Sequence, residues 1–154
     1  MKKTLIFDFD GTIADSLDAM VQIMNKYSHK YGFHRITEEK RDQMRHETSE
    51  TILLDFRLST WRLFILALRV KAELRRQVPT IKLISNMKAA LEQLHADGYT
   101  LGIATSNSKR TVELFLKNHG ITCFDFIYGR TVFDKTWLLK SIIRKYNLKP
   151  NNVI

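Results

Sequence analysis

The sequence predicts an α/β protein in which a parallel sheet carries helices and a small helical segment is inserted after the first strand. Three observations lead to this prediction. Apolar runs of strand length alternate with amphipathic helical patterns along the chain. About ninety residues separate the first two strands, far more than one crossover helix requires. Helical patterns fill most of that interval, which indicates an insertion.

Three short apolar runs have the composition of buried strands. They are KTLIFDF near the N-terminus, YTLGIAT at residues 99–105 and FDFIY at residues 124–128. Because strands alternate with helices at these lengths, we expect a Rossmann-like parallel sheet that is covered on both faces.

Three helical stripes accompany these strands. Gly98 and Gly120 stand where the first two helices should end, and Ser106, Asn107 and Ser108 are available to cap the second. Apolar residues recur at helical spacing in each stripe. The stripes are Leu83, Met87, Ala90, Leu91 and Leu94; Val112, Phe115, Leu116 and His119; and Leu138, Leu139, Ile142, Ile143 and Tyr146.

The inserted segment is predicted to be a small helical cap. We expect the α/β core to comprise residues 1–14 and 81–154 and the cap to comprise residues 15–80. Met and aromatic side chains form two stripes in the cap, which we interpret as its own core rather than a ligand site. The stripes are Met20, Ile23, Met24, Tyr27 and Tyr31; and Trp61, Phe64, Ile65 and Leu68.

The last residues resemble the start of another strand. Residues 151–154, which follow Pro150, have the pattern of a turn and the opening of a fourth strand. A sheet of three strands would leave apolar helix faces uncovered. We therefore expect this chain to be a fragment whose core is truncated at the fourth strand.

Composition narrows the class of protein and its partners. The formal net charge is +9, from 25 Lys and Arg against 16 Asp and Glu. The basic residues are spread along the chain, and the dense run RVKAELRRQ at residues 69–77 is typical of a solvated helix face, so nucleic acid is not the favoured partner. A positive surface equally attracts small phosphorylated metabolites.

Location and assembly are less constrained by the sequence. The single cysteine, Cys123, excludes an internal disulfide and fits a reducing compartment, so we expect a cytoplasmic protein. Charged residues interrupt every apolar run too early for a signal peptide or a membrane span. The oligomeric state is left open.

Polar side chains gather where the predicted strands end. In an open parallel sheet, ligands bind beyond the carboxyl ends of the strands. Acids, hydroxyls and an ammonium group are expected to meet there, a set that suits phosphoryl transfer through an aspartyl-phosphate. The residues are Asp8, Asp10, Gly11 and Thr12 after the first strand, Thr105 and Ser106 after the second, and Lys135 after the third.

Electrostatics then require a cation. A carboxylate about 4 Å from a phosphate dianion is repelled by roughly 8 kcal/mol at an effective dielectric constant of 20. A divalent cation and a lysine can cancel this repulsion, and oxygen ligands beside phosphate favour Mg²⁺. Lys135 follows the expected helix cap Asp134, where its charge opposes the helix dipole. This unfavourable position supports a functional role for Lys135.

Structural alternatives exist for each of these residues. The stretch DFDGT could be a turn or part of a calcium loop, but the third acid and the final glutamate of a calcium loop are missing. Considered singly, Thr105 could be an ordinary hydroxyl at a strand end and Lys135 one of many basic residues. Their positions after successive strands favour the functional interpretation.

Three stretches of the chain resemble the haloacid dehalogenase superfamily of phosphatases. They are FDFDGTIADS, LGIATSNSKR and the segment around Asp134 and Lys135. Their order and spacing are similar over the whole chain, and the helical insertion resembles the small cap of the phosphoglycolate-phosphatase-like branch. The resemblance implies an Mg²⁺-dependent phosphatase of a small phosphorylated metabolite.

The resemblance also implies roles for individual residues. Asp8 would be the nucleophile and a ligand of Mg²⁺, and Asp10 the general acid and base, with its main-chain carbonyl also facing the metal. Thr105 would hydrogen-bond the phosphoryl group, Lys135 would neutralise charge, and Gly11 would let the backbone approach the phosphate.

Further residues are candidates for substrate binding. Thr12, Ser106 and Asn107 lie within the matching stretches, and Ser106 stands where an asparagine is common. Arg45, in the cap segment MRHETSE, is a candidate for selecting the substrate; the alternative is a solvated helix residue.

Two departures from the family pattern leave other functions open. The family's fourth motif, a Gly-Asp with a further acid that completes the metal site, should follow Val153 and Ile154 but is absent. The chain could therefore be a phosphate-binding module with impaired catalysis. A phosphomutase is a further alternative, although Thr136 and Trp137 follow Lys135 where mutases among the relatives carry Pro-x-Pro-Asp.

Overall fold

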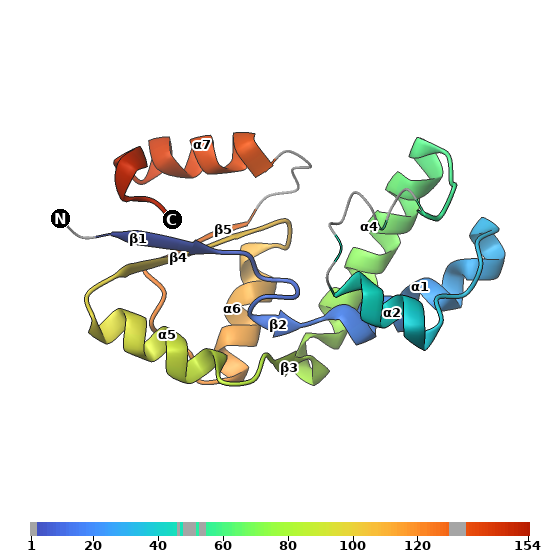
Figure 1. Ribbon diagram of the computed structural model, residues 1–154, viewed down its shortest axis with the longest axis horizontal. Coiled ribbons are helices and arrows are strands. Elements are labelled where there is room, and N and C mark those ends of the chain that lie inside the picture. The colour runs from blue at the N-terminus through green and yellow to red at the C-terminus, as the bar shows by residue number, and fades with distance from the viewer. Residues whose placement is uncertain (1–2, 46, 48–51, 53–54, 130–134) are drawn as a thin grey trace. The chain divides into compact units, whose positions relative to one another are not determined.

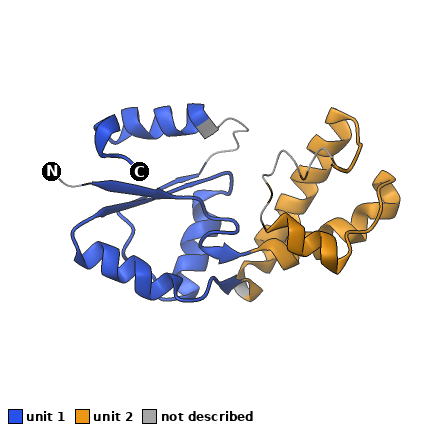
Figure 2. Ribbon diagram, in the orientation of Figure 1, with its two compact units in different colours: residues 1–15, 82–154 blue, residues 16–81 orange. Residues whose placement is uncertain are grey.

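The computed structural model describes residues 3–45, 47, 52, 55–129 and 135–154. The chain divides into two compact units (Figure 2). The first unit comprises Met1–Asp15 and Lys82–Ile154, and the second comprises Ser16–Ile81. Each unit is described below by itself.

A parallel sheet forms the centre of the first unit. Its strands are β1 (Thr4–Phe7), β4 (Thr100–Thr105) and β5 (Phe126–Gly129), in the order β1-β4-β5. Leu5 pairs with Leu101, and Gly102 with Phe126. The three strands fall where the sequence predicted them, which confirms the parallel α/β fold.

The final residues extend this sheet on the other side of β1. A short 3₁₀ turn, η2 (Pro150–Asn152), precedes a parallel bridge between Val153 and Thr4. The Ile154 amide donates to the Thr4 carbonyl at 2.9 Å, and the Ile6 amide donates to the Ile154 carbonyl at 2.8 Å. The expected opening of a fourth strand is confirmed, and it lies beside β1.

Helices cover both faces of the sheet. In Figure 1, α7 (Lys135–Lys145) lies on one side of it, while α5 (Met87–Ala96) and α6 (Lys109–Asn118) lie on the other. Side chains from the helices and from β4 are fully buried in the core of this unit. They include Leu91, Leu101, Ile103, Val112, Phe115 and Ile142.

The first predicted helix begins later than its apolar stripe suggested. Leu83 was expected on that helix, but it lies in β3 (Lys82–Leu83) and pairs with Ala14 of β2 (Ala14–Asp15). A turn follows before α5 starts at Met87. Asp15 pairs with Lys82, so the two connections to the second unit leave from one antiparallel ribbon.

The second unit is helical and has its own core. It contains α1 (Leu17–Tyr31), α2 (Glu38–Met44), α4 (Thr60–Gln77) and the short η1 (Val78–Thr80). The α1 stripe packs inward as predicted. The buried cluster consists of Val21, Ile23, Met24, Tyr31, Phe33, Ile36, Met44, Leu66 and Val70.

The second predicted stripe of this unit was wrong. Trp61, Phe64 and Leu68 are 63%, 47% and 44% exposed. The opposite face of α4 carries Leu66 and Val70, which are 2% and 7% exposed and join the core cluster. Because α4 has apolar residues around most of its circumference, its packing against α1 decides which of them are buried.

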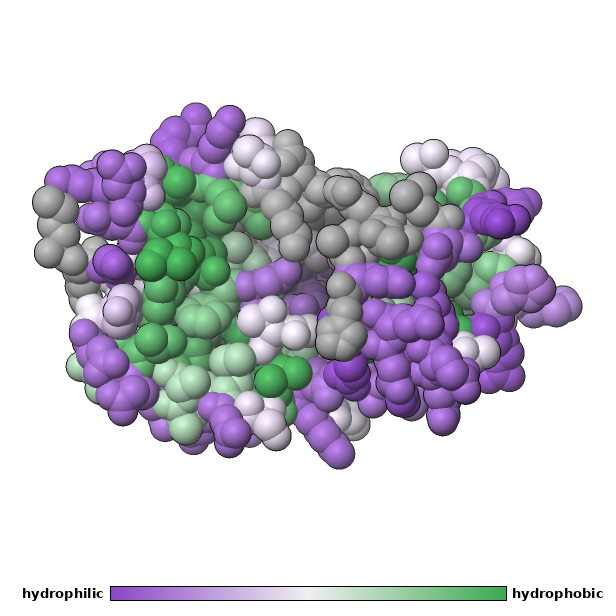
Figure 3. All heavy atoms as spheres, in the orientation of Figure 1, coloured by the Kyte–Doolittle hydropathy of each residue, from purple (hydrophilic) through white to green (hydrophobic). Residues whose placement is uncertain are grey.

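The visible surface differs between the two units. In Figure 3, hydrophobic residues gather over the sheet of the first unit between α5 and α7, whereas hydrophilic residues cover most of the second unit. None of the helices within the described ranges is long and apolar enough to cross a membrane.

Candidate active site

The segment after β1 alternates between outward and inward side chains. Asp8 and Asp10 are exposed, whereas Phe9 between them is 2% exposed and belongs to the core. The two carboxylates therefore leave the backbone on the outward side. The Asp8 Oδ1 atom accepts a hydrogen bond of 2.7 Å from the Phe9 amide, which orients that carboxylate.

A tight turn follows Asp10. Gly11 has φ of +75°, a conformation that residues with a side chain rarely adopt. Its amide donates to the Ala14 carbonyl at 2.9 Å, and the Ile13 and Ala14 amides both donate to the Phe9 carbonyl at 3.0 Å. Thr12 lies half-buried within this turn. The turn fixes the backbone that carries Asp10.

The end of β4 meets this turn. Thr105 is 1% exposed, and its Oγ1 atom accepts a hydrogen bond of 3.0 Å from the Asn107 amide. The Asn107 side chain is turned toward β1, where its Nδ2 atom donates to Asp10 Oδ2 at 2.6 Å. Ser106 lies exposed between Thr105 and Asn107. The structure therefore joins residues that are far apart in the sequence.

Gly129, at the end of β5, supports this loop and was missed by sequence reasoning. A Cβ atom on Gly129 would lie 2.5 Å from the Asn107 carbonyl oxygen and 2.7 Å from the Lys109 amide nitrogen. Only glycine allows the backbone of β5 to pass so close to the loop after β4. The available signal was a glycine placed directly after an apolar strand.

The N-terminus of α6 begins next to this loop. Ser108 is its N-cap, and Ser108 Oγ accepts a hydrogen bond of 3.2 Å from the Thr111 amide. This cap satisfies one of the amides that a helix start leaves without a partner. The sequence suggested Ser106, Asn107 and Ser108 as possible caps, and Ser108 is the N-cap in the structure.

Lys135 and Arg45 are two further predicted site residues. Lys135 is the first residue of α7, but its side chain and Asp134 lie outside the described residues. Arg45 belongs to the second unit, where it follows α2 and its Nη2 atom lies 3.6 Å from Asp18 Oδ1.

The donor set can be compared with what a metal ion requires. Within the described ranges, no group of three or more His, Cys, Asp and Glu residues could hold a metal. Asp8 offers an exposed carboxylate, and the backbone of Asp10 is two residues away. Hard divalent cations can bind through one or two carboxylates, with waters and substrate phosphate as their other ligands. The residues at this position therefore fit a divalent cation that retains part of its water shell.

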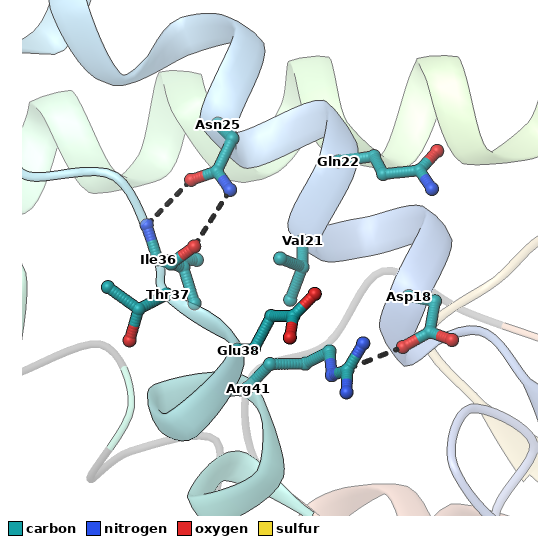
Figure 4. Close-up of a pocket in the computed structure, with 8 residues that line it drawn as sticks. All are labelled: Asp18, Val21, Gln22, Asn25, Ile36, Thr37, Glu38 and Arg41. Atoms are coloured by element: carbon teal, nitrogen blue, oxygen red, sulfur yellow. Dashed lines mark hydrogen bonds and ion pairs between the residues drawn. The ribbon is translucent and has the colours of Figure 1, made fainter.

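The second unit contains a separate hollow of about 250 Å³ (Figure 4). The Asn25 side chain exchanges hydrogen bonds of 3.0 and 2.7 Å with the Ile36 backbone. Arg41 lies 3.7 Å from Asp18 and 2.9 Å from Asp42. The Arg41 charge is thus paired with two carboxylates. The lining residues are Asp18, Val21, Gln22, Asn25, Ile36, Thr37, Glu38 and Arg41.

The chain belongs to the haloacid dehalogenase-like hydrolase family, whose model matches residues 5–154. It is similar to a phosphoglycolate phosphatase of Synechococcus elongatus, with 32% identity over 154 residues that cover 99% of this chain and 73% of the relative. The family and the enzyme class expected from the sequence, a phosphatase-like hydrolase, are confirmed.

Solved structures share the fold. A haloacid dehalogenase-like hydrolase from Streptococcus pneumoniae matches with a TM-score of 0.74 and 19% identity over 99% of this chain and 73% of that chain. CbbY from Rhodobacter sphaeroides, solved in complex with phosphate, matches with a TM-score of 0.70 and 18% identity over all of this chain and 76% of that chain. Both confirm the predicted α/β architecture.

Proposed function

We propose that this protein hydrolyses a small phosphorylated metabolite through an aspartyl-phosphate on Asp8. The observation that carries the proposal is the site at the ends of β1 and β4. Asp8 and Asp10 are exposed on one side of the chain, and Asn107 connects Asp10 to the loop that follows Thr105. The family membership and the similarity to a phosphoglycolate phosphatase support it.

In the first half-reaction, an oxygen of Asp8 attacks phosphorus. A bond forms between that oxygen and phosphorus while the bond from phosphorus to the leaving oxygen breaks. The carboxyl group of Asp10 gives its proton to the leaving oxygen, so the product departs as an alcohol. Phe9, buried between the two aspartates, fixes the backbone from which both side chains project.

In the second half-reaction, water attacks the aspartyl-phosphate. Asp10, which is now a carboxylate, takes a proton from this water as its oxygen bonds to phosphorus. The bond between phosphorus and the Asp8 oxygen breaks, inorganic phosphate leaves, and both carboxyl groups return to their starting states. Asp10 thus acts once as an acid and once as a base.

Other groups would stabilise the negative charge of the transferring phosphoryl group. The Thr105 oxygen accepts from the Asn107 amide, and its own hydrogen is proposed to bond to a phosphoryl oxygen. Lys135 would neutralise charge near phosphate, and Gly11 would admit the phosphate close to the backbone. Mg²⁺, held by the Asp8 carboxylate and the Asp10 main-chain carbonyl, would offset the repulsion between Asp8 and phosphate.

The proposed substrate is a small phosphate monoester. Phosphoglycolate is the first compound to test, because it is the substrate named for the Synechococcus elongatus relative. The second unit is proposed to act as a cap that selects the substrate, with Arg45 as a candidate contact. Its charge would suit an acidic group on the substrate.

The experiment measures phosphate release with Mg²⁺ from phosphoglycolate and from a panel of small phosphate esters. We expect Asp8→Asn to lower turnover by at least about a thousandfold, because the nucleophile is lost. Asp97→Asn, at the C-terminal end of α5, is the matched control and should retain activity. Unchanged hydrolysis by Asp8→Asn would show that the proposed nucleophile is wrong.

A second candidate function is phosphate binding with impaired turnover. The metal-ligating side chains favour this candidate, because the described residues hold no cluster of three of them. Calorimetric titration of the chain with Mg²⁺ and inorganic phosphate separates the two functions. Binding without hydrolysis supports this candidate, whereas tight Mg²⁺ binding with normal turnover contradicts it.

A further inference from the structure

We propose that Asn107 is a positioning residue for Asp10, which fixes the carboxyl group that exchanges the proton. The inference deepens the proposed function and rests on it for the role of Asp10. Asn107 was expected from the sequence to bind substrate, but its amide is directed at Asp10. Its Nδ2 atom lies 2.6 Å from Asp10 Oδ2, a short contact between an amide and a carboxylate.

The Asn107 side chain has little freedom to move. It is 8% exposed, and its backbone amide is held by the Thr105 hydroxyl at 3.0 Å. On the other side, its backbone carbonyl oxygen lies against Gly129, where an added Cβ would be only 2.5 Å away. The backbone of Asn107 is therefore held from both sides, which fixes the position from which its side chain reaches Asp10.

The Asp10 side chain is exposed, so the orientation of its carboxyl group depends on the hydrogen bonds that it makes. Its backbone is fixed by the turn in which Gly11 bonds Ala14 and by a bridge between Asp10 and Ala14. The remaining freedom is the rotation of the side chain about its two torsions. A hydrogen bond to Oδ2 restricts both torsions. The Asn107 amide makes this bond to Oδ2 and not to Oδ1.

The identity of the contacting atoms follows from chemistry. Oδ2 of Asp10 accepts a hydrogen bond both when the group is ionised and when the proton is on Oδ1, so the nitrogen of the Asn107 amide faces it rather than the oxygen. An aspartate at position 107 has nearly the same size but lacks the donor, and its charge would repel Asp10. Comparing Asn107→Ala with Asn107→Asp therefore separates the effect of losing the hydrogen-bond donor from the effect of losing side-chain volume.

The consequence for catalysis depends on the leaving group. An alkoxide needs a proton from the acid as it departs, whereas a dinitrophenolate is stable without one. A misplaced acid should therefore slow the departure of the alcohol from alkyl phosphates in the first half-reaction and leave the departure of 2,4-dinitrophenolate nearly unchanged. The second half-reaction, in which Asp10 acts as a base, is common to both esters. A general loss of structure would slow both reactions alike.

The first experiment compares phosphoglycolate with 2,4-dinitrophenyl phosphate. For Asn107→Ala and Asn107→Asp, we expect the single-turnover rate of leaving-group release to fall about a hundredfold with phosphoglycolate and to stay within about threefold with the aryl ester. Asn118→Ala, at the exposed end of α6, is the matched control. Equal losses on both substrates would overturn the positioning role. No hydrolysis of either ester by the wild-type chain would instead count against the proposed function.

The second experiment tests the contact without any turnover. Thermal unfolding midpoints are measured for Asn107→Ala, Asp10→Ala and the double variant. If the two side chains are coupled, Asn107→Ala lowers the midpoint by less in the Asp10→Ala background than in the wild-type chain. Additive shifts would overturn the inference even if the chain hydrolyses phosphate esters.

Discussion

Phe9 and Phe115 meet edge to face, with ring centroids 5.1 Å apart and ring planes at 86°. Phe115 is on α6, whereas Phe9 stands between the two aspartates of the site. Both side chains are almost completely buried. The residue that separates Asp8 from Asp10 is therefore anchored in the core, which couples the geometry of the site to the packing of α6.

We expect Phe115→Ala to destabilise the protein by about 3–5 kcal/mol, because it removes a buried ring and leaves a cavity beside Phe9. Leu114→Ala on the same helix is the matched control. Leu114 is 45% exposed, so its loss should change the free energy of unfolding by less than about 1 kcal/mol. Urea unfolding measures both variants, and equal losses would argue against the packing described here.

Thr105→Val should cost about 1–3 kcal/mol of unfolding free energy. The substitution keeps the shape of a buried side chain but removes the oxygen that accepts from the Asn107 amide, which leaves that N–H without this partner. Thr105→Ser restores the acceptor and should recover part of the loss. If valine and threonine are equally stable in urea unfolding, the hydroxyl does not hold the loop.

The stability of the second unit should depend on the Glu73 carboxylate and its two partners, Tyr27 and Lys26. The pKa of Glu73 is lowered, first because the Tyr27 hydroxyl donates to it and then because Lys26 lies 3.0 Å away. A carboxyl group with a lowered pKa stabilises the folded state above its unfolded pKa. This contribution disappears as the pH falls through the lower, folded pKa.

Tyr27→Phe should therefore weaken the acid dependence of stability. Between about pH 6 and pH 3, its unfolding midpoint should fall less than that of the wild-type chain, because the largest cause of the Glu73 shift is removed. Tyr99→Phe, in the first unit, serves as the control. Acid profiles of the same slope for Tyr27→Phe and the wild type would contradict this role for Glu73.

Local patterns were sufficient to predict the segment that carries the aspartates. The apolar run that ends in FDFDGT predicted that Asp8 and Asp10 follow the first strand, and both come just after β1. The positions of the strands also follow from local apolar runs. In each case the information lies within a few neighbouring residues, which is why the sequence alone predicts it.

Features that depend on distant neighbours could not be predicted. The Asn107 side chain donates to Asp10, which is 97 residues away in the sequence, and the loop that carries Asn107 lies against the backbone of Gly129 on another strand. Likewise, α4 has apolar residues on several sides, and only its packing against α1 buries Leu66 rather than Trp61. Helical periodicity cannot choose between two apolar faces.

The most direct test of the central claim is to identify the residue that becomes phosphorylated during turnover. The chain is mixed with phosphoglycolate and Mg²⁺, quenched in acid within one turnover, digested and analysed by mass spectrometry. The predicted result is one phosphoryl group on Asp8, absent from the Asp8→Asn variant. A phosphoryl group on another residue, or normal phosphate release by Asp8→Asn, would contradict the proposed mechanism.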